Sequence, residues 1–205
     1  MPAPKTLLLL LVFCALPLAA RAQTPAANSS APSIRLTRGE RLRLSGVPNA
    51  GRIDNVLYRG AQPRQSGFTQ LKELGISTIV DLRSENLPQI AWERRQAESL
   101  GIQFVNIPVN GWSPPTDAQV AQFLLIFRDH PGGKVFVHCH FGEDRTGVFV
   151  AAYRIAHDGW PADQAINEMY FFGFNGFWHP AMRSYVRSFP AQLKMAPALV
   201  LLSKP

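Results

Sequence analysis

Cys139 and Arg145 are the two side chains with the clearest capacity for covalent chemistry, and five residues separate them. Around them, residues 135–147 read VFVHCHFGEDRTG. A cysteine thiolate is a strong nucleophile, and the planar fork of an arginine can hold two phosphoryl oxygens at once. This spacing also arises by chance, so the flanking elements decide whether the two residues form a site.

The segment between these residues lies where a strand is expected to end and a helix to begin. Val135–Val137 is continuously apolar, as in a strand buried on both faces, and a helical pattern starts near Thr146. Successive loop N–H groups and the unpaired amides of the first helical turn form a cup that fits a phosphate dianion. The same field stabilises a thiolate, so we expect Cys139 to be nucleophilic at neutral pH. Gly142 permits the tight turn.

Together, the residues His138-Cys139-x5-Arg145-Thr146-Gly147 resemble the active-site loop of the cysteine-dependent protein tyrosine phosphatase superfamily, in its small dual-specificity branch. Two earlier segments, LYRGAQP at 57–63 and IVDLR at 79–83, resemble the opening elements of small exported bacterial members. The resemblance covers about 55–189. It implies an exported phosphatase.

The resemblance also assigns roles to residues. It implies Cys139 as the nucleophile, Arg145 as the phosphate ligand and Thr146 as a hydroxyl donor to the departing sulfur. Neither a metal nor another cofactor is implied. The phosphate would lie against the loop residues, which are His140, Phe141, Gly142, Glu143, Asp144 and Arg145.

Two aspartates are candidates for the general acid that protonates the leaving oxygen. Asp117 is the sole carboxylate in the segment 109–117, where the family keeps a mobile loop, but it stands later than the family's usual position and also fits a helix N-cap, as does Thr116. Asp144, directly before Arg145, occupies a position where some related phosphatases carry an aspartate proposed as the acid. We favour Asp144 and keep Asp117 as the alternative.

Several neighbouring side chains have both a functional and a structural interpretation. His138 is expected to brace the loop and to tune the thiolate. Arg59 and Arg83 end predicted strands, where substrate contacts gather in α/β folds. Ion pairs with acids such as Glu85 are the preferred interpretation of both arginines.

Aromatic residues gather in two places. Trp112, beside two prolines, forms either part of a closing loop or a rigid surface turn. Residues 171–178, FFGFNGFW, would either wall a pocket for a phosphotyrosine ring or pack in the core around a glycine hinge, and core packing is preferred.

The elements that must position the site alternate between strands and helices. This alternation predicts an α/β fold in which helices flank a central, mostly parallel sheet, with the phosphate loop between the last strand and the following helix. The expected strands are 55–58, 77–82, 103–107 and 134–138. The expected helices are 66–74, 90–100, 116–129, 146–157, 161–170 and 180–193.

The N-terminal segment predicts export. Lys5, the apolar run Leu7–Leu16 and the small-residue motif Ala20–Ala22 are typical of a secretory signal peptide over 1–22. We expect a flexible leader over 23–33, then a single phosphatase domain over 34–205, with no stable membrane span and a periplasmic or secreted location. Cys14 would leave with the signal, so the mature chain would keep a single cysteine.

Composition narrows the classes of function. The formal net charge of +7 would fall to +5 on removal of Lys5 and Arg21, which suits anionic substrates, but no basic helix indicates nucleic acid. The predicted activity is hydrolysis of phosphomonoesters, on phosphorylated protein and phosphotyrosine foremost. The alternatives are a phosphoinositide or small-phosphoester phosphatase, a non-catalytic phosphate-binding module and a rhodanese-like sulfurtransferase. The oligomeric state is left open.

Overall fold

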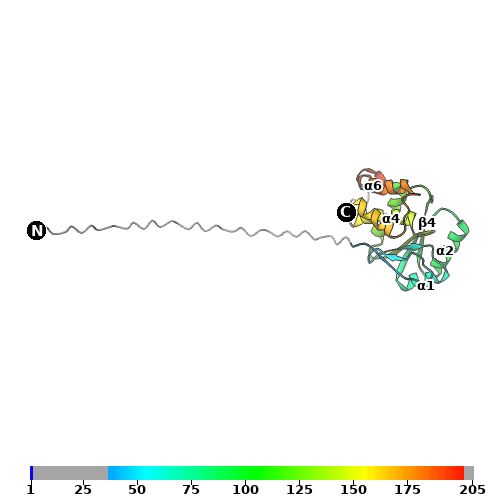
Figure 1. The fold of residues 1–205 in the computed structure, drawn as a ribbon. Helices are drawn as coiled ribbons and strands as arrows, with labels where there is room; N and C mark the ends of the chain where they lie inside the picture. Colours follow the sequence, from blue (N-terminus) through cyan, green and yellow to red (C-terminus); the bar gives the residue numbers. More distant parts are fainter. Residues whose placement is uncertain (2–36, 201–205) are drawn as a thin grey trace. The chain divides into compact units, whose positions relative to one another are not determined.

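A six-stranded sheet with the order β1-β2-β3-β6-β4-β5 organises the chain (Figure 1). The structure is a computed structural model that describes residue 1 and residues 37–200, so the predicted signal peptide and leader lie outside the described residues apart from Met1. Residues 37–200 belong to one compact unit, Ile34–Pro205. The strands are β1 (Glu40–Arg41), β2 (Gly51–Arg52), β3 (Leu57–Ala61), β4 (Ile76–Arg83), β5 (Gln103–Val109) and β6 (Lys134–Cys139).

The central strand of the parallel part is β6. It pairs in parallel with β3 on one side and with β4 on the other, and β5 adds in parallel beyond β4. Because both faces of this strand are covered, its side chains alternate between two cores: Val135 and Val137 enter one and Phe136 the other. At the opposite edge, β1 and β2 add antiparallel strands.

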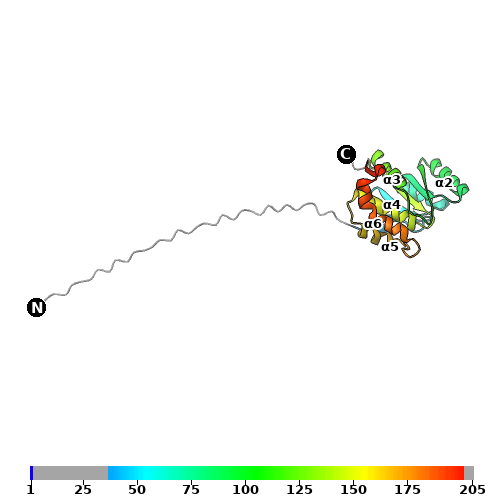
Figure 2. The same cartoon turned by 90° about the horizontal axis from the view of Figure 1, so that it is seen from above.

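Helices cover both faces of the sheet. Figures 1 and 2 show α1 and α2 on one face and α3, α4, α5 and α6 on the other. The larger of the two cores surrounds α4, in which all residues from Arg145 to Ile155 are buried. The helices are α1 (Gln65–Glu73), α2 (Leu87–Ser99), α3 (Asp117–Asp129), α4 (Asp144–His157), α5 (Ala162–Phe171), α6 (Pro180–Met195) and α7 (Pro197–Val200).

The predicted α/β class with a mostly parallel sheet is confirmed, and each expected strand and helix is present with small changes at its ends. The largest change is in β3, which runs three residues further than expected, to Ala61. The short strands β1 and β2 and the four-residue α7 were not predicted, because segments this short carry no periodic pattern. Within residues 37–200, no helix has both the length and the apolar character needed to cross a membrane.

Candidate active site

Cys139 is the last residue of β6, and the parallel strands on either side end at the same edge of the sheet. Ala61 of β3 is its register partner. The loop then crosses to Asp144, the first residue of α4. This junction of strand, loop and helix N-terminus is the arrangement predicted for phosphate binding.

A cavity of about 590 Å³ opens above this junction. It brings together five residues that the sequence predicted for the site: Cys139, His140, Phe141, Asp144 and Arg145. The remaining lining residues are Ser84, Glu85, Asn110, Gly111, Trp112 and His179. The other predicted site residues, Asp117, Gly142, Glu143 and Thr146, do not line it.

Arg145 is held in place by a carboxylate and a carbonyl. Its Nη1 and Nη2 atoms each donate to one oxygen of Glu85 at 2.8 Å, and Nη1 also donates to the Val109 carbonyl at 3.1 Å. A guanidinium has five N–H donors. These three bonds occupy the Nη1–Nη2 edge of the guanidinium. The two remaining N–H donors, one on Nε and one on Nη2, lie side by side on the Nε–Nη2 edge. That edge is a fork of the shape that two phosphoryl oxygens require.

The Glu85 contact corrects the sequence interpretation, which paired this acid with Arg59 or Arg83. The hydrogen bond from Arg145 lowers the pKa of Glu85 to about 2, so the pair stays ionised at any ordinary assay pH. Arg83 instead forms ion pairs with Asp81 and Glu93. The reason is positional: Glu85 lies beyond the end of β4, on the loop that faces α4.

The phosphate loop turns at Gly142, whose φ is 68°. A Cβ built there would lie 2.3 Å from the carbonyl carbon and oxygen of Gly60, so only glycine fits between the loop and β3. Asn49 and Arg59 donate to the Gly142 carbonyl, the former at 3.0 Å. Because Asn49 and Arg59 hold this carbonyl, the N–H groups of the loop remain to bind an anion.

Beneath the loop lies a fully buried cluster of charged and polar side chains. His138 Nδ1 lies 3.2 Å from the Cys139 carbonyl oxygen, and its Nε2 lies 3.3 Å from Glu93 Oε2. Asp81, Glu93 and His138 are near enough together to hold a cation. The Arg83 guanidinium, which donates to both carboxylates, already supplies that positive charge. The cluster therefore braces β6 where the loop begins.

The two candidate acids have different surroundings. Asp144 lines the cavity, where Oδ1 accepts the Asn175 N–H at 3.1 Å and Oδ2 lies 3.4 Å from His179 Nε2. Asp117 accepts the hydroxyl of Tyr185 at 2.9 Å. Thr116, not Asp117, is the N-cap of α3, in a capping box.

The hydroxyl of Thr146 is buried and has no hydrogen-bond partner within the described part of the chain.

The aromatic run 171–178 contains both buried and exposed side chains. Phe172 and Phe174 are buried, as core packing predicts, whereas Phe177 and Trp178 are exposed. Trp112, also exposed, lies with its ring centroid 5.3 Å from that of His179 at the cavity wall.

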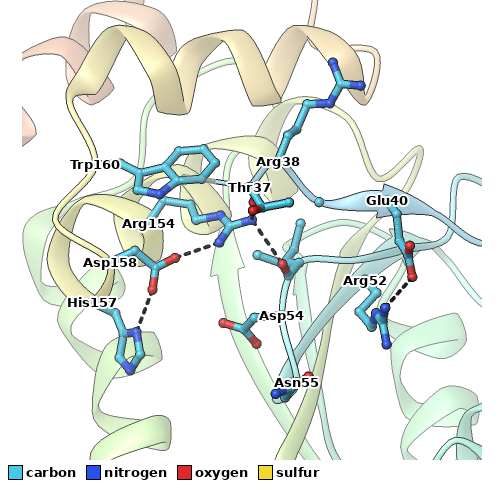
Figure 3. A pocket seen from close by; sticks show the side chains of 12 residues that line it. Thr37, Arg38, Glu40, Arg52, Asp54, Asn55, Arg154, His157, Asp158 and Trp160 are labelled. Atoms are coloured by element: carbon cyan, nitrogen blue, oxygen red, sulfur yellow. Dashed lines mark hydrogen bonds and ion pairs between the residues drawn. The ribbon is translucent and has the colours of Figure 1, made fainter. Parts of the chain in front are cut away.

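A second cavity, of about 530 Å³, lies at the opposite end of α4 (Figure 3). Arg154 crosses it, with its guanidinium 4.2 Å from the Trp160 ring centroid. Figure 3 shows Asp158 receiving a bond from Arg154 and contacting His157. Because Glu168 and two backbone carbonyls accept the other Arg154 bonds, each nitrogen of its guanidinium already donates within the protein.

Three residues of the site were not identified from the sequence in their roles: Glu85 as the partner of Arg145, Asn49 as a support of the loop, and His179 at the wall. Glu85 was considered only as a partner of other arginines. Asn49 offered a weak signal, since an asparagine directly after a proline is typical of a turn. His179 precedes a helix-starting proline, which is equally typical of an ordinary loop.

The fold and the loop from Cys139 to Arg145 define the class: this is the cysteine-dependent phosphatase fold, in the small dual-specificity branch. Residues 45–177 match the sequence model of a family described as "DSP-PTPase phosphatase fused to NAD+ Kinase". The chain belongs to this family.

Characterised relatives include the dual specificity protein phosphatase TpbA of Pseudomonas aeruginosa PAO1, which is 33% identical over 133 residues. That match covers 62% of this chain and 55% of the relative, so the chain spans about half of the protein it matches. Dual specificity protein phosphatase 26 of Rattus norvegicus is 28% identical over 148 residues, 67% of each chain. A crystal structure of P. aeruginosa TpbA superposes with a TM-score of 0.65 at 23% identity, covering 82% of this chain and 97% of that one, which supports the fold.

Proposed function

We propose that the chain hydrolyses phosphomonoesters, phosphotyrosine foremost, through a cysteinyl-phosphate intermediate on Cys139. The observation that carries the proposal is the cavity in which Cys139 lies at the start of the phosphate loop, beside an Arg145 whose Nε edge is left for substrate. The likeness to proteins named dual specificity phosphatases supports the same activity.

In the first step the sulfur of Cys139 attacks phosphorus, the S–P bond forms and the bond to the leaving oxygen breaks. Charge grows on the equatorial phosphoryl oxygens, where the loop amides and Arg145 can stabilise it. In the second step water attacks phosphorus, the S–P bond breaks and inorganic phosphate leaves. Thr146 is proposed to donate its hydroxyl to the departing sulfur, since that hydroxyl has no hydrogen-bond partner among the described residues.

Asp144 is the proposed general acid, in partnership with His179. It lines the cavity, and the imidazole 3.4 Å away offers a second site for the same proton. The pair would deliver one proton to the leaving oxygen and recover one from the attacking water. Asp117 remains the alternative, but its bond from Tyr185 and its place outside the cavity lining favour a structural role.

The walls of the cavity favour an aryl phosphate over a polyanionic lipid headgroup. Trp112, Phe141 and His179 give it aromatic surfaces that suit a phenyl ring. Arg145 is the only arginine or lysine among the described residues that line it, so additional phosphate groups would find no further such cation there. A TpbA structure described as a complex with pTyr is among the structural neighbours, which supports the same choice of first substrate.

Export is proposed from the signal-like segment 1–22, with a periplasmic or secreted destination. Fractionation of cells that express the tagged full chain tests this directly. Retention of the intact chain in the cytoplasm would contradict it.

The activity is tested by the hydrolysis of p-nitrophenyl phosphate and a phosphotyrosine peptide, with chelator present, by wild type, Cys139→Ser and Arg145→Lys. We expect no turnover from the serine variant. The lysine variant should lose at least about a hundredfold in kcat/KM, because a point charge cannot reproduce the fork. Denaturation during turnover should trap phosphate on Cys139.

The alternatives give different outcomes. A folded, reduced wild type that binds vanadate but does not turn over is a phosphate-binding module. Preference for a phosphoinositide over the phosphotyrosine peptide would favour the lipid phosphatase, and sulfite from thiosulfate would indicate sulfur transfer. Undiminished turnover by Cys139→Ser would overturn the cysteinyl-phosphate mechanism itself.

A further inference from the structure

Arg59 is completely buried in the middle of β3, directly beneath the phosphate loop. It is the register partner of Val137 in the parallel β3–β6 pair, two residues before the position opposite Cys139. Register partners in a sheet project to the same face, and residues two apart on a strand share a face. The side chains of Arg59 and Cys139 therefore project to the same side of adjacent strands, toward α4.

Within residues 37–200, the Arg59 guanidinium has no carboxylate within ion-pair distance, unlike the guanidinium groups of the buried Arg83, Arg145 and Arg154. One of its nitrogens, Nη2, donates to the Gly142 carbonyl. Its Nε and Nη1 atoms are buried without a hydrogen-bond partner in that same range.

A buried cation without a counterion is costly, so such a residue is retained where an anion compensates it. Phe172 contributes an aromatic face 4.2 Å from the guanidinium carbon, which offsets part of this cost. Burial lowers the pKa of Arg59 to about 10, and the negative charges of Glu168 and of ionised Cys139 oppose that shift. Glu168 is already bound to Arg154 and to the Gly39 amide.

An ionised Cys139 would therefore be an anion on this face that Arg59 compensates from the sheet below. Arg145 approaches the site from α4 and spends three of its donors on Glu85 and Val109. The further charged and titratable groups that face Cys139 or Arg59 are His138, His140, Glu143 and Asp144 on β6, the loop and α4, Glu85 and His179 at the rim, Arg41 on β1, and Glu168 on α5.

We propose that Arg59 is a positioning residue for the nucleophile: its buried charge holds Cys139 as a thiolate from below, and its bond to Gly142 keeps the loop amides directed at the phosphate. The inference rests on the proposed function, because positioning a nucleophile matters only if Cys139 attacks a substrate. The ionisation of Cys139 is a property that can be measured without any substrate, so the two proposals can fail separately.

The test follows alkylation of Cys139 by iodoacetamide as a function of pH in Arg59→Met, with the Cys139 peptide quantified by mass spectrometry. We expect the midpoint of alkylation to move up by about one pH unit or more, because a nearby opposite charge of this kind shifts ionisation by that amount. At the original midpoint a shift of one unit is about a fivefold loss of thiolate. The kcat/KM for p-nitrophenyl phosphate should fall at least as far.

Arg154→Met is the matched control, because it removes a buried arginine that also packs on an aromatic ring but belongs to the far end of α4. It should lower Tm and leave the alkylation midpoint of Cys139 unchanged. An unchanged midpoint in folded Arg59→Met would overturn the proposal. So would an equal shift in both variants, since that would reflect general loosening of the fold.

Two further measurements keep the proposal testable where Arg59→Met folds poorly: the behaviour of Arg59→Lys, and a double-mutant cycle of thermal stability between Arg59 and Cys139. The lysine retains the charge and should keep most of the thiolate, while it loses turnover because it reaches Gly142 less well. Cys139→Ser removes the anion, so it should lower Tm at neutral pH more in the Arg59 background than in the Arg59→Met background. Equal losses in both backgrounds would refute the electrostatic coupling.

Discussion

Glu85 and Arg145 form a bidentate ion pair, with both N···O distances at 2.8 Å, across the mouth of the cavity. The two side chains come from the end of β4 and the start of α4, sixty positions apart in sequence. Glu85 is half exposed and Arg145 is nearly buried. A surface ion pair of this kind adds little to stability, but here it fixes which edge of the guanidinium faces substrate.

Glu85→Ala should therefore impair catalysis more than folding. We expect kcat/KM to fall about ten- to a hundredfold, since a misplaced phosphate ligand costs this much, with Tm lowered by a few degrees at most. Since the pKa of Glu85 lies at about 2, the loss should be the same at about pH 5 and at about pH 8. Steady-state kinetics at both pH values measures this.

Glu73→Ala, at the end of α1, is the control for the loss of one acid and should leave kinetics unchanged. A lower KM in Glu85→Ala would contradict the interpretation, because it would mean that the carboxylate competes with phosphate for Arg145.

The leaving group distinguishes the two acid candidates. Asp144→Asn should reduce kcat/KM on phenyl phosphate about a hundredfold or more and have a small effect on kcat/KM for p-nitrophenyl phosphate, whose leaving group needs no proton. Asp117→Asn should reduce both rates equally and only slightly, through the lost bond with Tyr185. His179→Gln should follow Asp144→Asn in part. Equal loss on both substrates in Asp144→Asn would remove it as the acid.

The strands and helices could be predicted because their apolar patterns are long. Val135–Val137 is apolar on both faces, and α3 places Val120, Phe123 and Leu124 on one buried stripe. β1 and β2 could not be predicted in the same way. Each is two residues long and defined by its partner strand alone, and three of their four residues are exposed.

The centre of the site could also be predicted, because Cys139 and Arg145 lie on one local segment whose geometry follows from strand, loop and helix. The supports come from distant parts of the chain, and no local pattern connects them. Arg145 binds Glu85 because the segment after β4 approaches α4. Arg59 is buried without an acidic partner in the described part of the chain because Asp81, Glu93 and Glu168 contact other arginines.

Gly142 should tolerate no side chain. Gly142→Ala would place a Cβ 2.3 Å from the Gly60 carbonyl group at a φ of 68°, so the loop must move away from β3. Gly159 has a φ of 69°, and a Cβ built there would meet no described atom within 4 Å. Gly159→Ala therefore measures the cost of the backbone conformation alone, about 1 kcal/mol. We expect a much larger fall in Tm and at least about a hundredfold loss of kcat/KM for Gly142→Ala alone. Similar effects of the two variants would show that the contact with Gly60 is unimportant.

The buried cluster under the loop should make stability depend on pH. Burial raises the pKa of Glu93 from an ordinary 4.5 to about 8; the positive charge of Arg83 opposes this shift and the negative charge of Asp81 adds to it. Between these values the folded chain binds more protons than the unfolded chain, so the stabilisation present at low pH is lost as pH rises through about 8.

Glu93→Gln should flatten this dependence, because the amide cannot ionise. Glu98→Gln, on the exposed face of the same helix, serves as the control and should keep the wild-type slope. The free energy of unfolding in urea, measured at several pH values from about pH 5 to about pH 8.5, should fall by more than about 1 kcal/mol in wild type. An equal slope in wild type and Glu93→Gln would mean that Glu93 stays ionised beside Arg83, and the cluster would then carry a permanent negative charge beneath the loop.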